Sequence, residues 1–83
     1  MKQQLVHNCY FLMMNGLLYG LRTGLLSNAE QNKLVFEAMR HICLKFKDGS
    51  VRTNYLAELS GIEAQVTALL GKGMLHEGNN TIN

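Results

Sequence analysis

The sequence predicts an all-α fold, a small bundle of three to four helices. Apolar residues recur at steps of three and four along most of the chain, which is the period of one helical face. Proline is absent from all 83 residues, and a helix interior disfavours proline by about 3 kcal/mol. Breaks that contain glycine, near residues 24, 49 and 61, divide the apolar pattern into segments. A single helical domain spanning residues 1–83 is therefore expected.

The first predicted segment, residues 1–26, is an apolar helix. Its apolar side chains cover most of the helix circumference instead of forming one narrow stripe. Such a helix is either buried centrally or shared with a partner chain. Arg22, Thr23 and Gly24 end it, because glycine is the usual residue after a helix C-terminus. We therefore expect a dimer or partner surface at Leu5, Leu12, Met13, Leu17 and Leu21.

The second predicted segment, residues 27–47, is a helix with a capping box at its start. Ser27 and Glu30 have the required spacing, so that the serine hydroxyl accepts from the amide three residues on and the glutamate reaches back. The turn dipeptide Asp48-Gly49 follows the helix and separates it from the next segment.

The third segment, residues 51–75, supports two interpretations. Its apolar positions alternate steps of four and three, as they do on the apolar face of one continuous helix. Gly61 would then lie in the middle of that helix, where glycine costs about 1 kcal/mol relative to alanine. In the other interpretation Gly61 adopts a positive φ and forms a turn between two helices, at 52–60 and 63–71. The polar tail, residues 76–83, either frays or forms a vestigial β-hairpin.

Two pairs in the third segment have the character of a helix packed on a second helix across a tight turn. Leu56-Ala57 combines an apolar with a small residue, and Gly61-Ile62 combines a turn glycine with an apolar plug. On these residues the segment 53–75 resembles helix-turn-helix and winged-helix DNA-binding regulators. The resemblance implies a small transcriptional regulator that binds double-stranded DNA as a homodimer, with the first helix forming the dimer contact.

On this resemblance, polar residues of the third segment would contact DNA. Gln65 would pair with adenine and Thr67 would touch a thymine methyl group or a phosphate, while the others would anchor phosphates. The expected DNA-binding residues are Arg52, Thr53, Asn54, Gln65, Thr67 and Lys72. Because the net charge is only +2, such binding would depend on local charge.

A second pattern lies between Gly16 and Met39, where small and aromatic residues recur, among them Tyr19, Gly24 and Ala38. This run resembles a tetratricopeptide helical hairpin, of the kind that small chaperones and adaptors of bacterial secretion systems use to cover a partner's hydrophobic helix. The resemblance implies the alternative function: a protein-binding module, acting as chaperone, adaptor or phage-type inhibitor, that buries a partner helix against its first two helices.

The sequence predicts neither a metal site nor a catalytic group. The pairs His7/Cys9 and His41/Cys43 are two residues apart, so on a helix their side chains point to different sides and cannot share one ion. No phosphate-binding glycine loop or pair of acidic residues at a shared site is evident. We therefore expect no enzymatic activity and no cofactor.

The composition favours a cytoplasmic protein without a membrane span. Two cysteines are fewer than the disulfide framework of a small secreted domain normally has. The apolar run near the N-terminus has some character of a signal peptide, but Asn15 and Arg22 interrupt that pattern. The run is also shorter than the about 20 apolar residues of a membrane-spanning helix.

Overall fold

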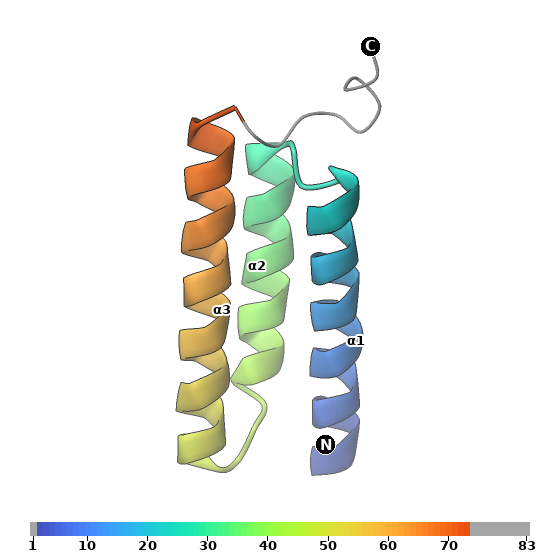
Figure 1. The fold of residues 1–83 in the computed structure, drawn as a ribbon. Helices are drawn as coiled ribbons and strands as arrows, with labels where there is room; N and C mark the ends of the chain where they lie inside the picture. The colour runs from blue at the N-terminus through green and yellow to red at the C-terminus, as the bar shows by residue number, and fades with distance from the viewer. Residues whose placement is uncertain (1, 74–83) are drawn as a thin grey trace.

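Three helices make up the fold of this computed structural model, which describes residues 2–73. Helix α1 spans Gln3–Thr23, α2 spans Ala29–Cys43 and α3 spans Gly49–Gly71. The chain runs up α1, down α2 and up α3, and α2 packs closely against both of the others (Figure 1). The prediction of a small all-α bundle is confirmed. The predicted hairpin falls in the C-terminal tail, outside the described residues.

The ends of α1 and α3 follow the sequence signals. Gly24 follows α1 with a φ of 80°, the left-handed conformation that glycine adopts without strain, and its N–H donates to the carbonyl of Gly20. Asp48 caps the N-terminus of α3, because its Oδ1 accepts from the amides of Ser50 and Val51 at 2.8 and 3.2 Å. The predicted breaks at Gly24 and at Asp48-Gly49 are confirmed.

The start of α2 differs from the prediction. Asn28, not Ser27, is the capping residue, and its Oδ1 accepts from the amide of Gln31 at 2.8 Å. The capping box that begins at Ser27 was therefore wrong by one residue. Asparagine and serine are about equally good caps, so adjacent candidates cannot be ranked by residue type alone.

Helix α3 is continuous through Gly61. Within residues 2–73 only Gly24 and Gly73 have a positive φ, and Gly61 has the backbone of a helix interior. The predicted turn at Gly61, with separate helices at 52–60 and 63–71, is therefore wrong. Leu59 and Val66, on either side of Gly61, are both buried on one helical face. Their burial, worth about 1.5–3 kcal/mol for each side chain, exceeds the about 1 kcal/mol that a mid-helix glycine costs.

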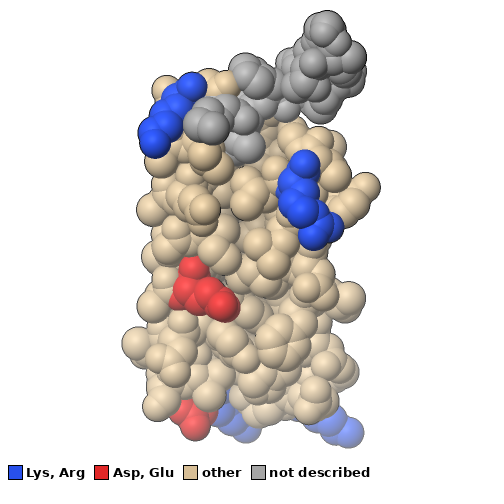
Figure 2. Space-filling view, in the orientation of Figure 1, with Lys and Arg blue, Asp and Glu red and all other residues tan. Residues whose placement is uncertain are grey.

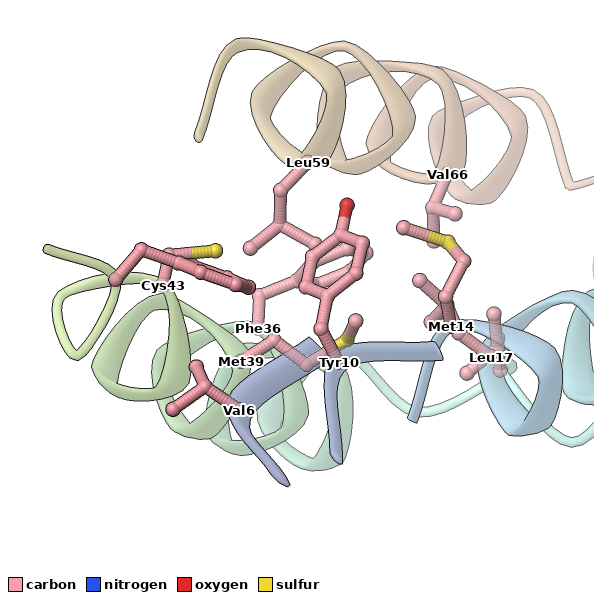
Figure 3. Packing of buried hydrophobic residues seen from close by; sticks show 11 residues of the cluster. Val6, Tyr10, Met14, Leu17, Phe36, Met39, Cys43, Leu59 and Val66 are labelled. Carbon is pink, nitrogen blue, oxygen red and sulfur yellow. The ribbon is translucent and has the colours of Figure 1, made fainter. Parts of the chain in front are cut away.

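The core is a column of apolar side chains enclosed by the three helices. Figure 3 shows nine of them by name, with Tyr10 extending its hydroxyl group toward α3. The buried apolar residues are Val6, Tyr10, Met14, Leu17, Leu26, Phe36, Met39, Cys43, Phe46, Leu59 and Val66. Aromatic rings fill the space between α1 and α3: the centroids of Tyr10 and Tyr55 are 4.3 Å apart, and that of Phe46 lies 5.1 Å from Tyr55. The backbones of α1 and α3 lie farther apart than those of the other two helix pairs, and these bulky rings occupy the space between them.

Candidate protein-binding surface on the first helix

Helix α1 has large apolar side chains on its solvent side as well as on its core side. Leu5, Leu12 and Tyr19 are 52%, 71% and 55% exposed. Because seven residues make about two turns, these three side chains form one row along the helix, with Cys9 and Gly16 between them. We call these five residues the α1 ridge. The chain has no Asp, Glu, Lys or Arg between Lys2 and Arg22, so the ridge is uncharged over its whole length.

Phe11 and Leu18 form a second exposed apolar pair, on the side of α1 next to α3, and Asn8 and Asn15 separate this pair from the ridge. Both are exposed and, like the ridge residues, they are seven positions apart. The ring centroid of Phe11 lies 6.2 Å from that of Tyr55, which places it beside the aromatic cluster. Extended exposed apolar surface of this kind marks interaction sites in soluble proteins.

A groove between α1 and α2 borders the α1 ridge. It has a volume of about 280 Å³, and a Cβ added at Gly16 would meet no atom within 4 Å. Its lining is almost entirely apolar: Met13, Gly16, Leu17, Gly20, Leu25, Leu26, Gln31 and Val35. A groove of this composition suits an apolar side chain presented by a partner helix.

The structure separates the predicted partner-surface residues into two groups. Leu5 and Leu12 are exposed, as a partner surface requires. Leu17 is 3% exposed and belongs to the core, while Met13 and Leu21 are partly buried against it. The prediction for Leu17 was therefore wrong, because apolar spacing around most of α1 does not reveal which side faces inward. The exposed residues that the prediction missed are Phe11, Leu18 and Tyr19.

The predicted DNA-binding residues lie along one straight helix and do not form a common surface. Arg52 and Lys72 are 20 positions apart, which is about 30 Å along α3. The Nη1 atom of Arg52 donates a hydrogen bond to the carbonyl oxygen of Phe46 at 2.8 Å, so this side chain stabilises the loop before α3. Gln65 and Thr67 are exposed but, two positions apart, point to nearly opposite sides of α3. Thr53, Asn54 and Lys72 are likewise exposed.

One face of the bundle has few charged side chains along its length (Figure 2). On this face the charged side chains lie at the upper and lower ends, apart from one basic group in the upper half and one acidic group about halfway. In α3, Glu63 forms an ion pair with Arg40 at 2.7 Å, and Glu58 accepts a hydrogen bond from Tyr10. A phosphate-binding surface would instead need clustered cations.

A second cavity, of about 350 Å³, lies between α2 and α3. The Arg40–Glu63 ion pair is part of its wall, together with Asn32 and Phe36. The Nδ2 atom of Asn32 donates to the carbonyl of Leu26 at 2.7 Å, whereas its buried Oδ1 has no hydrogen-bond partner. Because that oxygen is itself shielded from solvent, a ligand in the cavity would not reach it without side-chain movement.

The described residues contain no grouping suited to metal or thiol chemistry. Between residues 2 and 73, no three His, Cys, Asp or Glu side chains lie together as metal ligands would. Burial raises the pKa of the Cys43 thiol, which keeps it protonated and unreactive, while Cys9 is exposed on the α1 ridge. None of the three helices has both the length and the hydropathy needed to cross a bilayer.

Comparison of the chain with known protein families, with curated proteins and with solved structures gave no match. The surfaces of the fold are therefore the basis for inferring a function. Of these, the α1 ridge and the adjoining groove combine exposed apolar side chains with a concave apolar wall.

Proposed function

We propose that the chain is a helical protein-binding module, of chaperone or adaptor type, that packs the outer side of α1 against an apolar helix of a protein partner. The observation that carries this proposal is the α1 ridge, in which three large apolar side chains in one row are each more than half exposed. A protein that stays alone in solution rarely leaves such a row without a covering partner.

The geometry suits a helix as the partner. Apolar side chains at helical spacing on the partner would pack between Leu5, Leu12 and Tyr19, and one of them would enter the groove beside Gly16. Because this contact buries apolar surface and no described charge lies on the ridge, its affinity should depend little on salt. A DNA complex would behave in the opposite way.

The variant Leu12→Glu tests this proposal. Leu12 is the most exposed of the large apolar residues that the structure describes, so a charge there leaves the core intact but places an unpaired carboxylate in the interface. A partner is isolated from the source cells with the tagged wild-type chain, identified, purified and titrated calorimetrically. We expect Leu12→Glu to weaken its binding by at least about 30-fold, since an uncompensated interfacial charge costs about 2–5 kcal/mol.

Leu44→Glu is the matched control. Leu44 is 60% exposed and lies with Glu37, Arg40 and His41 around a different hollow of α2. We expect this variant to bind the partner as the wild type does. Equal losses in both variants, or undiminished binding by Leu12→Glu, would contradict a contact through α1.

The DNA-binding hypothesis has its own measurement. Fluorescence anisotropy with random duplex at low salt would detect binding, and an affinity that falls steeply with salt would support DNA as the ligand. In that case Arg52→Ala and Lys72→Ala should flatten the salt dependence. The continuous α3 and the sparse cations on it favour the protein partner, so we expect no salt-dependent duplex binding.

A further inference from the structure

We propose that the helix that covers the α1 ridge is α1 of a second copy of this chain, running antiparallel, so that the protein is a symmetric dimer. This inference rests on the proposed function, because it names the occupant of the same surface. Three observations lead to it: the spacing of the ridge, its alternation of large and small residues, and its area and charge.

The ridge has the spacing of a two-helix seam. Its residues, Leu5, Cys9, Leu12, Gly16 and Tyr19, follow one another at steps of four, three, four and three. This is the pattern with which one helix packs its side chains between those of another over several turns. The core of the chain itself uses a different set of α1 residues, so the seam is not needed for the fold.

The alternation of side-chain size selects the antiparallel direction. In a parallel pair in register each residue would face its own copy, so that leucine meets leucine and Gly16 meets Gly16, which leaves a void. In an antiparallel pair, Leu12 of one copy lies over Gly16 of the other and Tyr19 lies over Cys9, so that these large residues face small ones. The two-fold axis makes every such contact occur twice.

The exposed apolar area matches that of a dimer interface. An aromatic side chain presents about 200 Å², so the half-exposed Tyr19 offers about 100 Å². With similar amounts from Leu5, Leu12 and Leu25, which lines the groove beside the ridge, this side of the molecule offers about 400 Å², which is the apolar share of an interface of about 700 Å² on each partner. Because the ridge is uncharged, two copies can meet there without like-charge repulsion.

Sedimentation equilibrium over a wide range of concentration tests the dimer, with Gly16→Leu as the decisive variant. A Cβ at Gly16 meets nothing within 4 Å in the chain, and leucine is a better helix former, so the monomer should fold unharmed. In the dimer, the new side chain fills the space that a leucine of the second copy occupies. We expect a wild-type dimer and at least a tenfold higher dissociation constant for Gly16→Leu.

Gly61→Leu is the matched control, because it makes the same change in the middle of α3, where a Cβ also meets nothing within 4 Å. We expect its dissociation constant to equal that of the wild type. A dimer broken by Gly61→Leu but not by Gly16→Leu would move the interface to α3 and overturn the inference. A monomeric wild type would overturn it too; if Leu12→Glu then still abolished binding of another protein, the proposed function would stand alone.

Single-cysteine variants test the direction of the helices. In a Cys9→Ser background, Leu12→Cys places two thiols near the two-fold axis, where a short bis-maleimide joins them. Leu5→Cys and Tyr19→Cys place each pair of thiols about 15 Å or more apart along an antiparallel pair, beyond that linker. We expect the linker to join the two copies efficiently only in the Leu12→Cys variant. Equal joining of all three variants would show parallel helices and overturn the antiparallel arrangement.

Discussion

Tyr10 on α1 donates a hydrogen bond from its Oη to Oε1 of Glu58 on α3, at 2.6 Å and across 48 residues of sequence. The tyrosine ring is buried in the core, whereas Glu58 lies at the exposed rim. This bond links the two helices whose backbones approach each other least closely. It therefore helps to fix the rotation of α1 that turns the α1 ridge toward solvent.

Tyr10→Phe should lower the free energy of unfolding by about 1–2 kcal/mol. The variant keeps the ring and its stacking on Tyr55 but removes a hydrogen bond to a charged group, while the exposed Glu58 regains water. Urea unfolding followed by circular dichroism measures the change. Tyr19→Phe, at an exposed position, is the control and should change the unfolding free energy by less than about 0.5 kcal/mol.

The stability of the fold should decrease at alkaline pH. Burial, and after it the hydrogen bond to the Glu58 carboxylate, raises the pKa of Tyr10 well above its usual value. In the unfolded chain a tyrosine releases its proton near pH 10, so above about pH 10 the unfolded state binds fewer protons than the folded state, and stability falls as pH rises. Below that pH this contribution is fully present.

Burial also raises the pKa of Cys43, so its contribution should begin to fall above about pH 8.5, where an unfolded cysteine ionises. Urea midpoints measured from neutral pH upward should therefore decline in two stages. Tyr10→Phe should remove the decline of the urea midpoint above about pH 10, and Cys43→Ala should remove the decline that begins above about pH 8.5. A midpoint that stays constant from neutral pH to above pH 10 would contradict both assignments.

Gly61→Ala should stabilise the fold by about 0.5–1 kcal/mol. Gly61 has helical backbone angles and open space around its Cβ position, so alanine gains helix propensity without a clash. Gly24→Ala should instead destabilise it, because that residue has a φ of 80°. Thermal unfolding of the two variants compares them directly. A loss of stability in Gly61→Ala would indicate a turn at that position.

Asn28→Ala should cost about 1 kcal/mol of stability, and Ser27→Ala much less. The Oδ1 atom of Asn28 accepts the amide hydrogen bond that caps α2, at 2.8 Å from the nitrogen of Gln31. Paired urea titrations of the two variants decide which residue is the cap. A larger loss of stability in Ser27→Ala than in Asn28→Ala would indicate that Ser27 caps α2.

Leu17→Ala and Leu12→Ala should differ sharply in their effect on the monomer. Leu17 is buried in the core, so its truncation should cost about 2–5 kcal/mol, whereas Leu12 is exposed and its truncation should cost little. The comparison requires dilute protein, at which any association through α1 is absent. Similar costs for both leucines would mean that the rotation of α1 in the bundle is wrong.

Several elements of the fold followed from local chemistry. The helical period of the apolar residues, the left-handed glycine after α1 and the turn at Asp48-Gly49 involve neighbours in sequence, and the structure has each of them in its predicted place. Such features can be predicted from neighbouring residues, because the interactions that stabilise them lie within one or two helical turns.

The sequence by itself determined that this chain is a bundle of helices, that the first helix ends before Gly24 and that a turn at Asp48-Gly49 precedes the third. Tertiary structure decided which side of α1 is buried and whether Gly61 interrupts α3. Both depend on contacts between helices far apart in sequence: Tyr10 reaches Glu58 and Tyr55, while Leu59 and Val66 enter the same core as Leu17. The sequence of a helix that is apolar on nearly every side does not determine which side faces the core. A mid-helix glycine costs only about 1 kcal/mol, so it stays helical when nearby residues of the same helix are buried.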